Sequence, residues 1–370
     1  MKILQISSAQ AFGGGEQHLS DLTNELARRG HEVYAVVRPH SPLTLRLTEL
    51  PDERIKMLPL RNALDVQSAY ELARFVKQHQ VEIIHAHMAR DYSLAAYAAR
   101  RSATTKFIIT RHVLFRLNRL HRHIMARATR VIAVSEAVAA KLGAQNLLPV
   151  SRISIVQNGV DVEALAKNRR NSDRDQFCRD WDLPEDSLLV GTVGQLNPLK
   201  GHDLFLRAAA LVIESIPQAR FVVAGGDVSP NAETLGLLRK LIVELQLQNH
   251  VRLLGEVENV KSVLAALDVF VSSSRTESFG LAIVEAMASG LPVIATSTDG
   301  AREVVEPDHT GLIVPIGDHR FLATAIIKLL ADAQRRTQMG NRGQFRAREH
   351  FDLQRMVDAI ETIYRTSLSE

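Results

Sequence analysis

The stretch Ser274-Arg-Thr-Glu-Ser-Phe-Gly-Leu-Ala-Ile-Val-Glu285 lies between two short apolar runs, residues 268–273 and 292–296. Both runs are rich in β-branched residues, which is typical of strands buried in a parallel sheet. Between them the sequence predicts a helix over residues 280–289, and Gly290 follows as the residue after its C-cap. The stretch therefore predicts a strand, a helix and a second strand of an α/β fold.

Two acidic residues of this stretch are candidate ligand contacts. Glu277 is expected in the loop after the first strand and Glu285 two turns along the helix, and ligands of open α/β sheets bind at the carboxyl ends of strands. The backbone amides around Phe279 and Gly280 open the helix, where an anion is favoured. The stretch thus offers carboxylates for hydroxyl groups and a positive helix end for a phosphate, and a nucleotide-activated sugar carries both kinds of group. The alternative is an ordinary pair of surface carboxylates.

Composition limits the class of protein. The chain has 370 residues, enough for two domains, and one cysteine, Cys178, which excludes an internal disulfide and suits a reducing compartment. The N-terminal apolar run is too short for a signal peptide, and no stretch approaches the ~20 apolar residues of a membrane span. We therefore expect a cytoplasmic protein. No zinc-ligand spacing or nucleic-acid motif occurs, so we expect neither a metal site nor a nucleic-acid partner.

Charge is unevenly distributed along the chain. Residues 1–165 carry 22 Lys and Arg against 14 Asp and Glu, whereas the remaining residues carry 23 against 27. The basic first part suggests an anionic partner, either a phosphorylated acceptor or a membrane surface. An excess of solvated surface charge explains the balance equally well.

Repeated pairs of a strand and a helix with short connections predict doubly wound parallel sheets in both parts of the chain. We predict one such domain over residues 1–165 and a second over residues 188–352. Residues 166–187 combine dense charge with weak apolar periodicity, and we interpret them as an interdomain linker with a short helix over 175–181.

A glycine-rich loop, Gly13-Gly-Gly-Glu16, follows the first predicted strand and precedes a helix. The glycines do not fit the G-x-G-x-x-G pattern, and Arg38 stands where a dinucleotide site has an acidic residue, which argues against NAD binding. Gly14 and Gly15 can still bring bare backbone close to a phosphate or a sugar. A tight turn is the alternative explanation.

With these features in place, the chain resembles the large family-4 retaining glycosyltransferases of GT-B architecture. Residues 277–285 are similar to the E-x7-E motif of that family. The other elements that carry the resemblance, in order, are Gly13-Gly-Gly-Glu16, Ile84-His-Ala-His87, Ala133-Val-Ser135, Asn158-Gly-Val-Asp161, Lys200-Gly201 and Gly311-Leu-Ile-Val-Pro315. The resemblance covers essentially the whole chain. It implies two Rossmann-like domains facing a cleft, a final helix over 353–370 that packs back on the first domain, and transfer of a sugar with retention of configuration.

The resemblance implies that the second domain binds the donor, for which a UDP- or GDP-sugar is expected, without a metal or other cofactor. Glu277 then binds hydroxyl groups of the donor sugar, and Glu285 binds the ribose diol. Cleavage of the bond between sugar and diphosphate places negative charge on the leaving phosphate, which preorganised donors stabilise. We assign Lys200, a cation in a loop at the carboxyl end of a strand, to this phosphate; a solvated loop lysine is the alternative. Further donor contacts are expected at Gly14, Gly15, Gln195, Ser278, Phe279, Gly280 and Leu281.

The sequence departs from the family at Gln195, where the usual pattern has an arginine that supplies a second cation to the diphosphate. Glutamine donates hydrogen bonds but carries no charge. A hydrogen bond to a charged group contributes roughly 1.5–3 kcal/mol, against about 1 kcal/mol for a neutral one. By sequence, Arg275 is the nearest cation that can replace the missing charge.

The resemblance places His112, at the carboxyl end of a first-domain strand, beside the reacting sugar, where it either hydrogen-bonds the donor sugar or helps the acceptor proton to leave. Glu277, His112 and Lys200 then form the expected catalytic group. It also implies that His87 lines the cleft and that His85 is structural. Since His85 and His87 lie on one face of a strand, metal binding is an alternative, but no third ligand is evident. The residues expected on the acceptor side are Glu16, His87, Arg116 and Arg119.

Residues 92–135 hold nine Lys or Arg and no acidic residue. Within them, residues 115–127 mix leucine and isoleucine with arginine in a pattern that can form a basic amphipathic helix. Such a helix can lie on an anionic membrane or contact a lipid-phosphate acceptor, and a packed helix with a solvated basic face is an equal alternative. We therefore expect an anionic or lipid-linked acceptor, namely a glycolipid, lipopolysaccharide or polysaccharide precursor, and peripheral membrane contact through residues 115–130.

Two other functions use the same features. A nucleotide-sugar epimerase shares the two-domain plan, but it needs residues that abstract a proton from the sugar ring, and the whole-chain pattern fits it less well. A catalytically weak nucleotide-sugar-binding protein is the second alternative, and Gln195 is the only residue that supports it.

Overall fold

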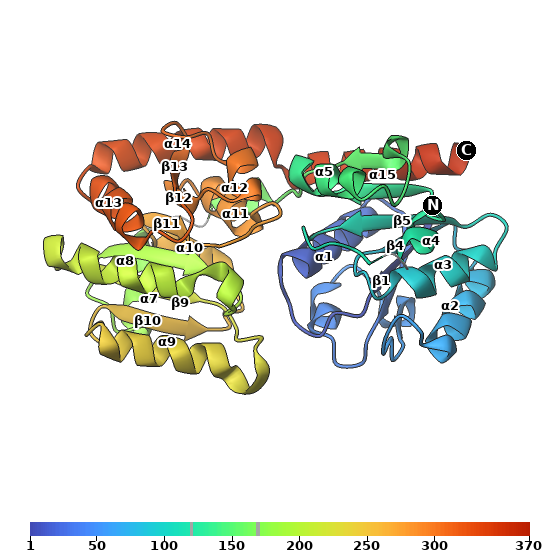
Figure 1. The fold of residues 1–370 in the computed structure, drawn as a ribbon, viewed down its shortest axis with the longest axis horizontal. Coiled ribbons are helices and arrows are strands. Elements are labelled where there is room, and N and C mark those ends of the chain that lie inside the picture. The colour runs from blue at the N-terminus through green and yellow to red at the C-terminus, as the bar shows by residue number, and fades with distance from the viewer. Residues whose placement is uncertain (119–120, 168–170) are drawn as a thin grey trace. The chain divides into compact units, whose positions relative to one another are not determined.

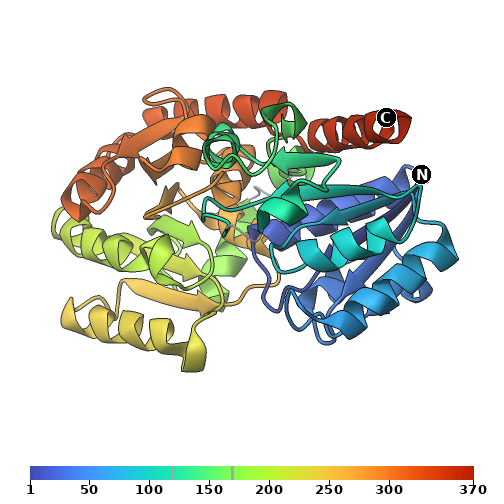
Figure 2. The ribbon, with the colours of Figure 1, turned by 45° about the vertical axis from the view of Figure 1, so that its right-hand side comes forward.

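The computed structural model describes residues 1–118, 121–167 and 171–370 (Figure 1). They form two compact units, one of Met1–Gly159 with Leu353–Glu370 and one of Val160–Asp352. Each unit has a parallel β-sheet with α-helices packed on it, as Figure 2 also shows. This confirms the predicted α/β class with two doubly wound parallel sheets.

The described residues of the first unit contain a seven-stranded sheet in the order β3-β2-β1-β4-β5-β6-β7. All neighbouring strands are parallel. The order reverses between β1 and β4, so the loops at their carboxyl ends diverge there and leave room for a ligand. The strands are β1 (Lys2–Ser7), β2 (Glu32–Val37), β3 (Ile55–Met57), β4 (Ile83–Ala86), β5 (Lys106–Arg111), β6 (Arg130–Ala133) and β7 (Ile153–Ile155).

Helices of the first unit connect these strands and return from the end of the chain. They are α1 (Gly14–Arg28), α2 (Val66–His79), α3 (Tyr92–Arg100), α4 (His121–Met125), α5 (Glu136–Ala144) and α15 (Leu353–Ser369), with short 3₁₀ turns at η1 (Pro42–Arg46), η2 (Asp52–Arg54) and η3 (Val150–Arg152). Local capping fixes several starts: Asp65 accepts a hydrogen bond from Ser68 N at 3.1 Å before α2, and Ser135 accepts one from Val138 N at 3.2 Å before α5.

Helix α15 shares the hydrophobic core of the first unit. Val357, Ile360 and Tyr364 of α15 are fully buried with Leu22 and Leu26 of α1. At the rim of this contact, the Arg29 guanidinium binds Asp358 at 2.6 Å and Glu361 at 3.0 Å. The last helix is therefore a structural part of the first unit, although 193 residues of the second unit, Val160–Asp352, separate it in sequence.

The described residues of the second unit contain a six-stranded parallel sheet in the order β10-β9-β8-β11-β12-β13. The strands are β8 (Leu188–Val193), β9 (Ala219–Ala224), β10 (Val251–Gly255), β11 (Val269–Ser272), β12 (Val293–Thr296) and β13 (Gly311–Val314). Every residue of β11 and β12 is buried, as their runs of β-branched residues predict.

Helices cover the sheet of the second unit. They are α6 (Val162–Lys167), α7 (Asn171–Asp180), α8 (His202–Ser215), α9 (Glu233–Glu244), α10 (Val260–Ala266), α11 (Leu281–Ala288), α12 (Asp299–Val304), α13 (His319–Leu330) and α14 (Ala333–His350), with 3₁₀ turns at η4 (Pro198–Lys200) and η5 (Pro230–Ala232). Helices α8, α9 and α13 share one apolar core with the strands, while α11 packs against α14 and α6. At the entry and exit of the unit, Val160 N donates to Phe351 O at 2.9 Å.

The interpretation of residues 166–187 as a linker differs from the structure. The units divide between residues 159 and 160, and the stretch supplies α7, which packs against α10. Its Arg174 donates to the Asp268 carboxylate at 3.0 Å and to Ser187 O at 2.6 Å, which fastens α7 to the sheet. The dense charge of this stretch thus includes a residue that binds the second unit.

The amphipathic helix predicted over residues 115–127 is wrong in the described part of the chain, where only α4 is helical. Arg111 donates through its side chain to Phe115 O, and Leu117 N donates to the Gln145 side chain at 2.9 Å. These backbone groups are therefore bonded to side chains instead of to neighbouring turns. Arg119 lies outside the described residues.

Because Ile360 is buried in the core that α15 shares with α1, we expect Ile360→Ala to lower the free energy of unfolding by about 2–5 kcal/mol. The exposed Thr362→Ala on the same helix should change it by less than about 0.5 kcal/mol. Urea unfolding monitored by circular dichroism measures both, and equal effects would contradict the packing of α15.

Candidate functional site

Two loops of the second unit meet because β8 and β11 are neighbours in the sheet. The Ser273 hydroxyl, after β11, donates to the carbonyl groups of Lys200 at 3.1 Å and Gly201 at 2.9 Å, after β8. Arg275 N also donates to Leu199 O at 2.7 Å. Gly201 has a φ of 64°, and a Cβ there would lie 2.2 Å from Ser273 O, so only glycine fits at this contact.

The Arg275 side chain joins the same two loops. Its guanidinium donates two hydrogen bonds to Asp203, at 2.8 and 2.7 Å, and one to Pro198 O at 2.8 Å. Partial burial acts to raise the pKa of Asp203, but the hydrogen bonds and charge of Arg275 outweigh it and leave that pKa below its usual value. Arg275, the predicted replacement for the charge missing at Gln195, is therefore already bound to a carboxylate.

Lys200 and Glu277, which are 77 residues apart in sequence, form an ion pair where these loops meet. The Ser274 hydroxyl donates to the same Glu277 oxygen at 2.9 Å. The side chains are 28% and 14% exposed, so both charges are largely withdrawn from water. The structure thus brings together two residues that the sequence assigned to one site.

The start of α11 depends on Gly280. Its φ of 98° is a left-handed conformation, and a Cβ there would lie 2.9 Å from the Ile283 side chain. The preceding Phe279 is buried and packs edge-on against Phe351, with ring centroids 5.7 Å apart. Phe279 therefore offers the site its backbone, while its side chain anchors the loop in the core.

A residue that sequence reasoning missed supports this loop from α12. Gly300 N donates to Glu277 O at 3.0 Å. A Cβ at Gly300 would lie 2.5 Å from Phe279 N, so the backbone of the loop rests directly on the glycine. The Thr-Asp-Gly sequence that follows the strand 292–296 was the available signal.

The other predicted donor contacts of the second unit lie on the same two loops and on α11. Glu285 lies half-buried one turn into α11, and Ser278 and Leu281 are half-buried beside Gly280. The carbonyl group of Gln195, half-buried after β8, lies 3.2 Å from Nε2 of His202. Burial lowers the pKa of His202 to about 4, so its neutral ring can donate this hydrogen bond and hold the loop.

In the first unit, the glycine loop and His112 meet. Gly13 precedes α1, and a Cβ at Gly15 would lie 3.5 Å from Cγ of His112. Glu16 lies in the first turn of α1; burial raises its pKa, and the backbone amides of Glu16 and Gly13 oppose that rise. Gly14 is exposed at the opening of the helix. The loop thus presents backbone and one carboxyl group next to the histidine.

Four histidines cluster around this loop. Nδ1 of His87 lies 3.2 Å from Nε2 of His112, and Nε2 of His87 lies 2.9 Å from Oε1 of Gln5. His18, which sequence reasoning missed, packs edge-on against His112 with ring centroids 4.8 Å apart. The His85 nitrogens lie 2.6 Å from the Tyr364 hydroxyl and 2.7 Å from the Thr110 hydroxyl. The nitrogens of His85 are therefore bonded within the fold.

Burial lowers the pKa of all four histidines, to about 4 for His18 and well below the usual value for His85, His87 and His112. The rings are therefore neutral at physiological pH. Neighbouring Asp91 shows the opposite effect, because burial raises the pKa of its carboxyl group to about 6 although Ser8 N donates to it at 2.8 Å.

Among the described residues, His18, His87 and His112 form a group whose ligand atoms lie within 4.8 Å of one another. The third ligand that the sequence did not reveal is thus present in space, with His112 and His18 in place of His85. However, the closest nitrogens, on His87 and His112, are 3.2 Å apart and hydrogen-bonded. This bond occupies one lone pair, on the ring that accepts it, so an ion would have to displace the shared proton.

The structure describes one of the two arginines that the sequence predicts on the acceptor side. Arg116 is exposed in the loop after β5, and the predicted acceptor residue Arg119 lies outside the described residues. No helix in the described parts of the chain is long and apolar enough to cross a membrane.

Comparison with known proteins places the chain in a family. Residues 12–164 match the family described as Glycosyltransferase Family 4, and residues 173–346 match the family described as Glycosyl transferases group 1. With two Rossmann-like parallel-sheet units, the fold is that of the GT-B glycosyltransferases, as predicted. The chain belongs to the family-4 glycosyltransferases.

Two relatives cover most of the chain. It is 26% identical to N-acetyl-alpha-D-glucosaminyl L-malate synthase of Bacillus anthracis, over 97% of this chain and 95% of the relative. It is 27% identical to a D-inositol 3-phosphate glycosyltransferase of Corynebacterium urealyticum, over 88% and 84%. Among solved structures, it is similar to Anabaena Alr3699/HepE in complex with UDP-glucose, with a TM-score of 0.89, 22% identity and coverage of 99% and 100%.

The contact of Gly300 with the site loop is testable by adding a single methyl group. We expect Gly300→Ala to push the backbone of Phe279 away, to cost about 1–3 kcal/mol of unfolding free energy and to speed hydrogen exchange at residues 277–281. Gly236→Ala on α9 is the matched control, because a Cβ there meets nothing within 4 Å. It should stabilise the unit by about 0.5–1 kcal/mol. Unchanged exchange in Gly300→Ala would disprove the contact.

Proposed function

We propose that the protein is a retaining glycosyltransferase that moves a sugar from a nucleotide-sugar donor, a UDP- or GDP-sugar, to an anionic or lipid-linked saccharide precursor. The observation that carries the proposal is the ion pair between Lys200 and Glu277 at the carboxyl ends of β8 and β11. It holds a cation for a diphosphate beside a carboxylate for sugar hydroxyl groups, which is the combination that a nucleotide sugar requires.

The ion pair keeps both groups ready for the donor. A buried charge without a partner is costly, so in the free protein Lys200 and Glu277 satisfy each other. When the donor binds, the diphosphate takes over Lys200, and hydroxyl groups of the sugar donate to Glu277. As the bond between the anomeric carbon and the phosphate oxygen breaks, Lys200 and the start of α11 at Gly280 stabilise the charge that develops on the leaving group. Glu285 binds the ribose diol.

Retention follows in this proposal from reaction on one face of the sugar. The acceptor oxygen bonds to the anomeric carbon on the side that the phosphate leaves, and the acceptor proton passes to a phosphate oxygen. No general base is then required. Burial lowers the pKa of His112, which makes it a weak base at neutral pH, and this agrees with a reaction without a general base. His112 contacts the sugar without accepting a proton, and no metal takes part.

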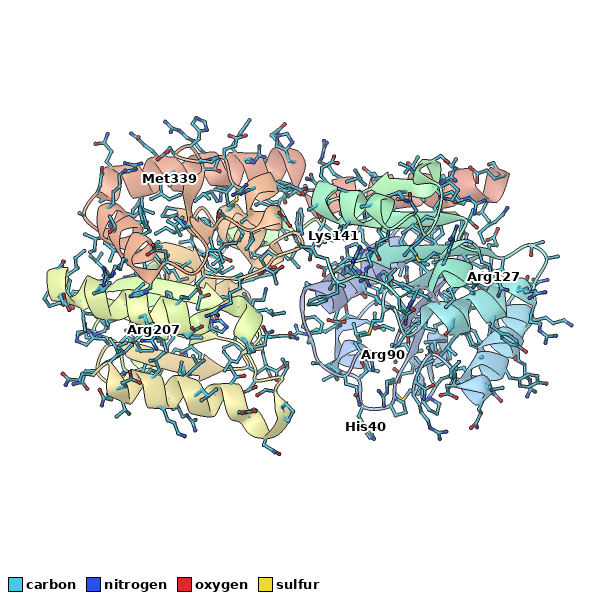
Figure 3. All side chains as sticks on the ribbon, in the orientation of Figure 1. His40, Arg90, Arg127, Lys141, Arg207 and Met339 are labelled. Atoms are coloured by element: carbon cyan, nitrogen blue, oxygen red, sulfur yellow. The ribbon has the colours of Figure 1, made fainter. Side chains whose placement is uncertain are left out.

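The acceptor is proposed from charge and from the relatives. The names of the two full-length relatives contain L-malate and inositol 3-phosphate, which are anionic, and a mannosyltransferase of Rhizobium meliloti, 27% identical over 66% of this chain and 68% of that protein, acts in lipopolysaccharide core biosynthesis by its name. The first unit exposes many basic side chains, among them Arg90, Arg127 and Lys141 (Figure 3). Peripheral membrane contact through residues 115–130 and the acceptor roles of Glu16, His87, Arg116 and Arg119 remain predictions.

One observation favours a second candidate, a nucleotide-sugar-binding protein with weak catalysis. Gln195 carries no charge, and Arg275 is bound to Asp203 instead of being available to the diphosphate. The stabilisation of the leaving group then depends on Lys200 and on backbone amides. Such a site binds the donor but turns it over slowly.

A donor-turnover assay decides between the two candidates. A thermal-shift screen of UDP-, GDP- and ADP-sugars first identifies the donor, because a ligand that binds the folded state raises the unfolding temperature. With that donor, we expect Lys200→Met and Glu277→Gln each to lower kcat/KM by about 10²–10³-fold. Lys240→Met, an exposed lysine on α9 of the same unit, is the control and should retain wild-type activity.

Proton NMR of the product reports the anomeric configuration, and EDTA in the assay tests the need for a metal. Retained configuration and full activity in EDTA are the expected results. Donor binding without turnover by the wild-type protein would instead favour the binding protein.

A further inference from the structure

A line of hydrogen bonds connects the last helix of the first unit to His112. Tyr364 on α15 accepts a hydrogen bond from Nε2 of Gln5 at 3.3 Å, and Oε1 of Gln5 lies 2.9 Å from Nε2 of His87. Nδ1 of His87 in turn lies 3.2 Å from Nε2 of His112. Tyr364, Gln5 and His87 are at most 6% exposed. Water therefore has little access to the links between Tyr364, Gln5 and His87, and the protons of these links have defined places.

Counting protons along the line fixes the state of each ring. The amide nitrogen of Gln5 faces Tyr364, so its oxygen faces His87 and can only accept. Nε2 of His87 must then carry the proton. A neutral imidazole has one N–H, so Nδ1 of His87 is an acceptor, and the proton between the two histidines belongs to Nε2 of His112.

Tyr364 lies at the far end of this line from His112 and bonds to both Gln5 and His85. Its hydroxyl lies 2.6 Å from Nδ1 of His85, and Nε2 of His85 lies 2.7 Å from the Thr110 hydroxyl. Since Gln5 donates to the Tyr364 oxygen, the single proton of the hydroxyl goes to His85. A lone pair of the Tyr364 oxygen accepts the hydrogen bond from the Gln5 amide nitrogen, and this bond distinguishes the two orientations of the amide. Without the hydroxyl, the Gln5 nitrogen loses its acceptor, and the amide can adopt either of its two orientations.

The ring of His112 is also held from its sides. His18 packs edge-on against it, Gly15 lies behind it, and its Nδ1 is covered by the surrounding protein. The only proton of the neutral ring points to His87. Because one nitrogen of His112 is bonded to His87 and the other is covered, neither is available for proton transfer to a ligand.

We propose that Tyr364 is a positioning residue that acts through Gln5 and His87 and holds His112 in the tautomer with its proton on Nε2. The contribution of this arrangement to sugar transfer rests on the proposed function, whereas the tautomer itself does not.

The tautomer is measured on the full-length protein without substrate. Histidine labelled with ¹⁵N distinguishes protonated from bare ring nitrogens by chemical shift, and loss of a signal in His112→Asn assigns it. We expect wild-type His112 to show a protonated Nε2 and a bare Nδ1. In Tyr364→Phe both nitrogens of His112 should shift toward intermediate values, because both tautomers become populated.

Tyr92→Phe is the matched control. Tyr92 is equally buried in the same unit, and its hydroxyl donates to Thr110 O at 3.2 Å, outside the line to His112. This variant also loses one buried hydrogen bond, but it should leave the His112 signals unchanged. If Tyr364→Phe fails to fold, Gln5→Leu breaks the line one residue nearer to His112 and should give the same mixture of tautomers.

A wild-type His112 protonated on Nδ1 or on both nitrogens would overturn the proposal, as would Tyr364→Phe or Gln5→Leu with an unchanged tautomer. In the transfer assay, Tyr364→Phe should lower kcat by about tenfold, the equivalent of one buried hydrogen bond, with donor KM nearly unchanged. A protein with the expected tautomers and no transferase activity would contradict the proposed function and leave the tautomer assignment standing.

Discussion

The site of the second unit depends on the ion pair between Lys200 and Glu277. Two partly buried charges from distant parts of the sequence stabilise each other here, because either one alone would keep only part of its hydration. Three surrounding contacts hold the two loops so that Lys200 and Glu277 lie together. The β8–β11 pairing aligns the loops, Ser273 ties one loop to the other, and Gly300 supports the backbone of the Glu277 loop.

The first unit has neutral side chains at its centre where the second unit has an ion pair. Its central side chains are neutral histidines, whose pKa values burial lowers, and they share protons with Gln5 and Tyr364 instead of pairing with charges. In the proposed reaction, the neutral ring of His112 would not repel the positive charge that develops on the sugar. Neutral histidines agree with the proposed transfer, in which the leaving phosphate, and not a side chain, takes the acceptor proton.

The fold class and the place of the second-unit site could be predicted from sequence, because parallel strands place their carboxyl ends at one edge of a sheet. That rule located Lys200 and Glu277 without any knowledge of their contact. Interactions over long sequence distances were not accessible: the bond of Arg174 to Asp268 turned a predicted linker into part of a unit, and the bond of Arg275 to Asp203 removed the predicted replacement cation. The partners of His112 likewise became visible only once folding brought α1, β4 and α15 together.

A crystal structure of the protein with its nucleotide-sugar donor, or with UDP or GDP and the free sugar, would show whether the ion pair between Lys200 and Glu277 opens to bind the donor. We expect the direct bond between Lys200 and Glu277 to be replaced, with the Lys200 ammonium group donating to the diphosphate and Glu277 accepting from sugar hydroxyl groups. A donor bound elsewhere, or bound here with the ion pair intact, would rule out this role of Lys200 and Glu277.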